Sequence, residues 1–167
     1  MAEKEELVKE KLDFTGIFDF KTFYSYTHSW LIDEDFGVIE EKYSEKISGN
    51  ARDIIIDWLC KQKLSDYFRM DFKLEFDIKG LSDVEVEIDG ERKRMNKGKI
   101  GLTIKGALTI DPENKWETPP IYKFMRDIYN KYIIPSRVEA MRNKVKDNVA
   151  SLKEELKAFL ELSGRKK

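Results

Sequence analysis

The strictest constraint on the fold of this chain is an alternation of apolar and polar residues between positions 66 and 111. Successive side chains of a strand point to opposite faces, so the alternation predicts strands with one dry face and one wet face. A single wet face favours antiparallel pairing, because parallel strands are usually covered on both sides. The residues predicted to form the dry face are Met70, Phe72, Leu74, Phe76, Ile78, Ile100, Leu102, Ile104, Leu108 and Ile110.

Turn-forming residues divide the neighbouring sequence into further strands. Asp89-Gly90 is the strongest hairpin signal, since a type I′ turn needs positive φ angles and these residue types tolerate them. Residues 52–62 carry apolar side chains on both faces, which predicts a central strand covered on both sides. Gly101 and Gly106 predict a bulge or a close approach by a neighbouring element. The expected strands are 38–47, 52–62, 68–79, 84–88, 91–95 and 99–110, with turns at 48–50, 64–67, 80–83, 89–90 and 96–98.

A helix is predicted from Asp19 to Ile32, ahead of these strands. Asp19 suits its N-cap, where the carboxylate would accept a hydrogen bond from the backbone N–H of Thr22. One face of this helix is heavily aromatic, and we expect it to pack on the sheet. The alternative is that the stripe lines a cavity for an apolar ligand. The candidate lining residues are then Phe23, Tyr24, Trp30, Trp58 and Trp116.

Two helices are predicted after the last strand. Pro119-Pro120 suits the first turn of one helix, which Pro135 ends or kinks. Ser136 then caps a second helix that runs to about Leu162 and is ~40 Å long, longer than a small sheet is wide. Its distal apolar residues therefore either fold onto the aromatic helix or form an exposed row, which a second chain would cover in a two-fold dimer. The dimer is the favoured outcome, and its interface candidates are Leu152, Leu156 and Phe159.

Together these patterns predict one α+β domain over residues 19–164. Its antiparallel sheet has five or six strands in meander order, covered on one face by the N-terminal aromatic helix and the two C-terminal helices. Residues 1–18 are expected to be a charged segment that is loose or forms a short helix, and 165–167 a basic tail. A sheet closed around a long C-terminal helix resembles the helix-grip folds that bind apolar ligands. The resemblance is architectural only, because here the first helix precedes all the long strands and the helical end is split at Pro135.

The sequence carries few of the residues that common active sites need. His28 is the single histidine and Cys60 the single cysteine, which excludes the usual zinc sites and an internal disulfide. Neither a glycine-rich phosphate loop nor a nucleophile elbow is present. Glu41 and Glu45 fall on one side of a predicted strand, either as structural carboxylates or as an acid–base pair, and the structural role is favoured. No catalytic residue, metal ligand or cofactor is therefore predicted.

The most basic stretch surrounds a predicted hairpin. Two explanations compete for it: an arm that grips phosphates, or a charged sheet edge that resists aggregation. Charged residues make up 38% of the chain but the net charge is -1, so we favour the charged edge and expect no nucleic-acid partner. The residues of this basic patch are Arg92, Lys93, Arg94, Lys97 and Lys99.

The sequence favours a non-catalytic interaction or assembly protein, with the long C-terminal helix as the surface for a partner or a second copy. A carrier or sensor of an apolar ligand held between sheet and helices is the first alternative, and a carboxylate-based enzyme the second. No apolar run approaches the ~20 residues that span a bilayer, and residues 1–11 do not resemble a signal peptide. With a single cysteine, these features predict a cytoplasmic protein.

Overall fold

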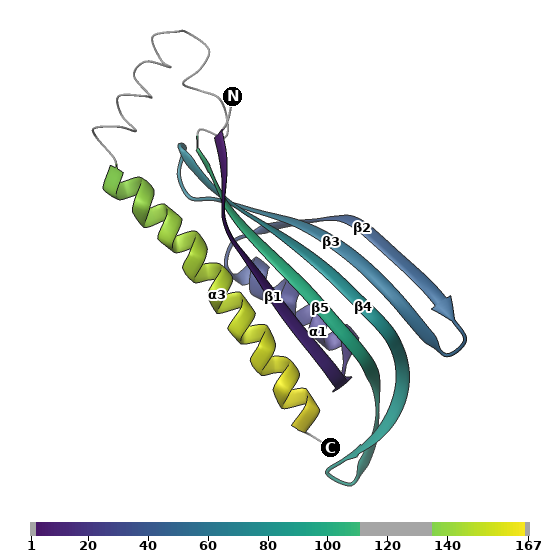
Figure 1. The fold of residues 1–167 in the computed structure, drawn as a ribbon. Coiled ribbons are helices and arrows are strands. Elements are labelled where there is room, and N and C mark those ends of the chain that lie inside the picture. Colours follow the sequence, from purple (N-terminus) through teal and green to yellow (C-terminus); the bar gives the residue numbers. More distant parts are fainter. Residues whose placement is uncertain (1–2, 111–134, 166–167) are drawn as a thin grey trace.

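The computed structural model describes residues 3–110 and 135–165, which form a five-stranded antiparallel sheet and two helices (Figure 1). The α+β class and the antiparallel sheet are confirmed. The helix predicted between Pro119 and Pro135 lies outside the described residues. The elements in chain order are β1 (Glu3–Phe18), α1 (Phe20–Asp33), β2 (Gly37–Ser48), β3 (Ala51–Lys63), β4 (Phe68–Ile88), β5 (Glu91–Ile110) and α3 (Pro135–Arg165).

The strands lie in the order β1-β5-β4-β3-β2. Strands β2 to β5 follow the predicted meander, but β1 crosses over to pair with β5. The prediction that residues 1–18 are loose or helical is therefore wrong for Glu3–Phe18. Leu12, Phe14 and Phe18 alternate toward the core, and most residues between them are polar, which suits a strand at the edge of a sheet.

Strand β4 is longer than predicted because the turn expected at 80–83 is a bulge. The register of β4 against β5 shifts between Lys79 and Ser82 while the pairing continues on both sides of the shift. Gly80 has a φ of 63°, and this left-handed conformation lets the strand bend without ending.

Strand β5 likewise continues through the turn expected at 96–98, since these residues pair with β1 and with β4. The hairpin at Asp89-Gly90 is confirmed. Its two residues have φ of 51° and 81°, as a type I′ turn requires.

The sheet has an inner face, which packs on α1 and α3, and an opposite outer face. On β3 the residues Ile54, Ile56 and Trp58 point inward and are buried, whereas Ile55 on the outer face is 40% exposed. Strand β3 is thus central in the sheet, but the prediction that it is covered on both sides is wrong. Both helices of the described chain lie on the same face of the sheet.

Helix α1 begins where the sequence predicts. Asp19 caps it, accepting hydrogen bonds from the backbone N–H of Thr22 at 3.3 Å and from the Thr22 hydroxyl at 2.8 Å. The buried residues Phe23, Thr27 and Leu31 face the sheet. The helix therefore joins the core through the aromatic stripe, and Asp33 ends it.

Helix α3 lies along β1 and β5 (Figure 1). A methyl group added at Gly106 of β5 would lie 2.7 Å from Val149 and 2.9 Å from Val145 of this helix. The predicted close approach is confirmed at Gly106. Only a residue without a side chain lets the backbones come this near.

The distal half of α3 is covered by its own chain. Leu152 and Leu156 are fully buried, and Phe159 stacks on Tyr26 of α1 with ring centroids 4.7 Å apart. The length of the helix allowed two outcomes, and the structure shows one of them: the distal half of α3 folds onto the aromatic helix α1. The exposed row that a two-fold dimer would cover is therefore not present, because α1 extends the surface on which α3 packs.

Candidate functional surfaces

The predicted ligand-lining residues lie at or near an aromatic cluster between α1 and the sheet. The structure buries Phe23 and Trp58 fully and Tyr24 and Trp30 in part. Trp116 lies outside the described residues. Four of the five candidates are thus part of the packed interior or its rim.

The rings of this cluster fill the space between helix and sheet. The Trp58 ring is 4.9 Å from that of Tyr24 and 5.0 Å from that of Phe76, and Phe23 contacts Phe76 edge-on at 6.3 Å. The two surface hollows of the described chain that we consider below contain none of these rings. The cluster therefore acts as core in this structure.

A carboxylate that sequence reasoning missed closes the rim of the cluster. One oxygen of Glu40 accepts hydrogen bonds from the Tyr24 hydroxyl at 2.9 Å and from the Trp58 indole N–H at 3.1 Å. Burial, followed by the hydrogen bond and the negative charge of Glu40, raises the pKa of Tyr24 to about 12. Glu40 thus ties α1 to β2 and β3, while His28 packs its ring edge-on against Trp58 at 5.7 Å.

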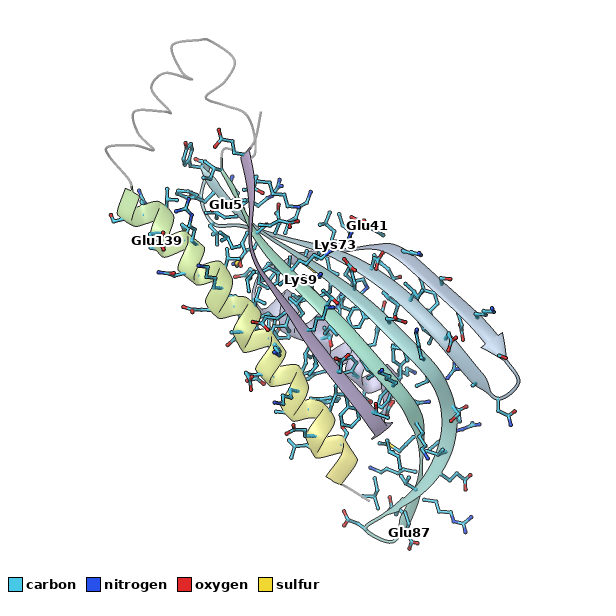
Figure 2. All side chains as sticks on the ribbon, viewed as in Figure 1. Glu5, Lys9, Glu41, Lys73, Glu87 and Glu139 are labelled. Atoms are coloured by element: carbon cyan, nitrogen blue, oxygen red, sulfur yellow. The ribbon has the colours of Figure 1, made fainter. Side chains whose placement is uncertain are left out.

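A bulge in β2 decides which glutamate faces the cluster. The pairing of β2 with β3 shifts between Glu40 and Lys42, so Glu41 is the extra residue and projects into solvent (Figure 2). Glu45 pairs instead with Arg52 of β3 at 3.5 Å. The bulge breaks the alternation on which the acid–base alternative for Glu41 and Glu45 depended.

The basic patch is divided between the two faces of the sheet. Pairing with β4 and the alternation along β5 place its members as follows: Arg92 and Arg94 on the inner face, and Lys93, Lys97 and Lys99 on the outer face. Arg92 lies 3.8 Å from Glu85, and Arg94 lies 3.6 Å from Asp83. The five residues therefore do not present one surface to a phosphate chain.

Lysines from three strands lie side by side on the outer face. Lys105 of β5 is directly opposite Lys9 of β1 and Lys73 of β4, and Figure 2 labels the latter two. The Lys105 ammonium lies 2.9 Å from Glu75 and lowers the pKa of that carboxyl. A hollow of about 190 Å³ beside them is lined by Lys4, Glu6, Leu59, Asp71, Phe72, Lys73, Lys105 and Ala107. Acidic groups thus accompany the lysines at this hollow.

The exposed apolar surface concentrates on β2 and β3. Four of the six large hydrophobic side chains that are exposed on the described residues belong to these strands. Tyr43 and Ile47 share the inner face of β2 and are 51% and 70% exposed. Figure 1 shows the β2–β3 hairpin extending beyond α1 and α3. The six residues are Ile32, Ile39, Tyr43, Ile47, Ile55 and Leu162.

Strand β2 is also an open edge of the sheet. Within residues 3–110 and 135–165 it pairs with β3 alone, and nearly all of its twelve residues are exposed. Its outward backbone N–H and C=O groups are thus available to another strand. The bulge at Glu41 limits the regular part of this edge to Lys42–Ser48.

A second open edge lies on the far end of β4. The pairing of β3 with β4 ends at Arg52 and Leu81, whereas β4 and β5 stay paired as far as Ile88. Residues 84–95 therefore form a two-stranded arm beyond the rest of the sheet (Figure 1). An open hollow of about 470 Å³ lies between the arm and the β2–β3 hairpin and is lined by Ile47, Gly49, Asn50, Arg52, Asp83 and Arg94.

Comparison with known proteins leaves the structure as the only guide to function. No family model, curated protein or solved structure matches this chain. In the described part of the chain, no helix is long and apolar enough to cross a membrane, and no three His, Cys, Asp or Glu residues are placed to hold a metal ion. Burial raises the pKa of the Cys60 thiol to about 12.

Proposed function

We propose that this chain is a non-catalytic protein-binding domain, whose partner adds an extended strand to the open edge of β2. The observation that carries the proposal is the regular edge Lys42–Ser48, with Tyr43 and Ile47 exposed on its inner face. The proposal keeps the interaction class that the sequence favours. It moves the binding surface from α3, whose apolar stripe is buried, to the opposite edge of the sheet.

Strand addition gives both affinity and selectivity at such an edge. The backbone groups of β2 supply hydrogen bonds to any extended chain, and alternate side chains select its sequence. Apolar residues of the partner would face Tyr43 and Ile47 on the inner side. Acidic residues would face Lys42 and Lys46 on the outer side. The fitting partner is therefore an extended segment that alternates apolar and acidic residues.

The order of the elements favours the carrier alternative, but the close packing of the core opposes it. Strand β1 precedes α1 and pairs with β5, so a long strand does precede the first helix, as a helix-grip architecture requires. The space between sheet and helices is nevertheless filled by the chain's own side chains, including fully buried Trp58, Phe76 and Leu156. A ligand would have to displace this core, at a cost of several kcal/mol.

A synthetic peptide that alternates valine with glutamate tests the proposal. We expect it to bind the parent and to shift the backbone amide NMR signals of β2. Changing Tyr43 and Ile47 together to lysine should weaken binding at least ~10-fold, because charges replace both apolar contacts. The control is Ile55→Lys, which adds one lysine to the outer face of the neighbouring strand. Equal binding by all three proteins, or no binding to the parent, would contradict the proposal.

A further inference from the structure

We infer that the strand received by β2 is residues 83–88 of a second copy of this chain, paired antiparallel with residues 43–48. The inference rests on the proposed function and names its partner. The first reason is that each copy carries both halves of the contact. The edge of β2 is open along Lys42–Ser48, and the edge of β4 is open beyond Leu81 among the described residues.

The arm has the alternation that the β2 edge selects. Val84, Val86 and Ile88 lie on one face of β4, and Asp83, Glu85 and Glu87 lie on the other. This pattern matches the apolar and acidic partner that Tyr43, Ile47 and the two lysines of β2 require. The arm presents it on a strand that β5 already holds extended, so little order is lost on pairing.

One register satisfies both faces of the contact. Placing Val84 opposite Ile47 brings two apolar pairs and one pair of opposite charge together, and it puts no like charges opposite each other. Glu45 then faces Val86 and keeps its own partner, Arg52. The three favourable pairs are Ile47 with Val84, Tyr43 with Ile88, and Lys46 with Glu85.

Self-pairing of β2 lacks this complementarity. In a two-fold pair of β2 strands, centring on Lys42 or Lys46 puts each lysine opposite itself, and centring on Glu45 does the same for that carboxylate. Centring on Ser44 puts Lys42 opposite Lys46, and centring on Tyr43 puts Glu41 opposite Glu45. Centring on Ile47 avoids like charges but pairs only residues 46–48 of the regular edge. Like charges directly opposite each other destabilise a sheet. The arm of a second copy is therefore the better partner for β2 than a second β2.

Disulfide trapping between two variants that each gain one cysteine tests the contact. Ile47→Cys protein is mixed with Val84→Cys protein, so that a disulfide between these positions can form only between copies. Cys60 stays in place, because its burial and raised pKa keep it unreactive. We expect the mixed dimer to form at least ~10-fold faster than in a control mixture of Ile55→Cys with Val84→Cys, since pairing raises the effective concentration of the thiols.

Exchanging the two charges of one pair provides a second test, on protein that carries no added cysteine. Light scattering on the parent should show a mass that rises with protein concentration and falls at high salt. Lys46→Glu and Glu85→Lys should each lower the association constant, and the double exchange should restore most of it. Circular dichroism melts check that every variant is folded.

The outcomes separate the two proposals. A parent that stays monomeric, or a mixed disulfide no faster than the control, would overturn pairing between copies. If the valine–glutamate peptide still binds β2 in that case, the proposed function stands with a different protein as its partner. If the peptide also fails to bind, both proposals fall.

Discussion

At the scale of single residues, the exposed Glu40 connects two rings of the aromatic cluster. It accepts the hydrogen bonds of both Tyr24 and Trp58, and the bulge at Glu41 turns it toward them. A carboxylate at the rim thereby satisfies the polar groups of two rings whose bodies belong to the core.

Glu40→Ala should lower the free energy of unfolding by about 1–2 kcal/mol, because the Trp58 N–H and the Tyr24 hydroxyl lose their acceptor. Denaturant melts near neutral pH measure this. The control Glu41→Ala removes an exposed carboxylate one position away and should change stability by less than ~0.5 kcal/mol. Equal effects of the two changes would show that Glu40 is not a specific acceptor.

The pKa of Tyr24 predicts how stability depends on pH. Its folded value of about 12 lies above the unfolded value of ~10. The stabilisation linked to the neutral phenol is therefore fully present below pH ~10 and is lost as the pH rises through the folded value. Ultraviolet titration of the phenolate should show the pKa falling in Glu40→Ala while staying above its ordinary value, since burial is the largest cause. An unchanged pKa would contradict the hydrogen bond.

At the scale of elements, two glycines set how the strands turn and pack. Gly90 closes the arm with a φ of 81°, and Gly106 admits α3 to the sheet. Each position tests a different interaction, because one constrains the backbone and the other leaves room for a neighbour.

Gly90→Val should destabilise the protein by about 1 kcal/mol or more, because a β-branched residue is strained at positive φ. Gly90→Asn is the control and should cost less, since asparagine tolerates this conformation. Thermal melts compare the two. If the valine variant melts with the parent, the turn of the arm is not the one described.

Gly106→Ala should cost about 1–3 kcal/mol through overpacking, because the new methyl group meets Val149 and Val145 at under 3.0 Å. The control is Gly101→Ala, whose nearest neighbours lie 3.5 Å away and need not move. Adding Val149→Ala to the first variant should recover part of the loss. Equal melts for the two single alanine variants would mean that α3 sits farther from β5.

At the scale of the whole molecule, the helices form one core with the inner face of the sheet. The consequence is that Leu152, Leu156 and Leu160 of the distal end of α3 belong to this core. Leu156 is fully buried, whereas Leu162, six residues later, is 56% exposed.

Leu156→Ala should lower the free energy of unfolding by about 2–5 kcal/mol through loss of buried surface and the resulting cavity. Leu162→Ala, the same change at an exposed site, should cost less than ~0.5 kcal/mol. Light scattering should show no difference in mass between either variant and the parent. A variant at Leu156 that stays fully stable but loses self-association would restore the helix end as an interface.

The sequence by itself determined the elements that depend on neighbours along the chain. Asp19 identifies the start of α1 because an N-cap bonds within its own first turn, and Asp89-Gly90 identifies a hairpin because the turn's φ angles suit those residues. The dry faces of β4 and β5 follow in the same way from alternation. These features need no knowledge of what lies across the core.

Tertiary structure decided whatever depends on contacts between distant segments. Strand β1 forms because β5 is there to pair with it, although its charged sequence alone favours a loose end. Glu40 faces the aromatic cluster because a bulge against β3 shifts the alternation of β2. Phe159 is covered because Tyr26 and Phe23 of α1 lie where a neighbouring chain would otherwise be needed. Each outcome balances burial against the chain entropy of bringing remote segments together, and a local pattern contains only one side of that balance.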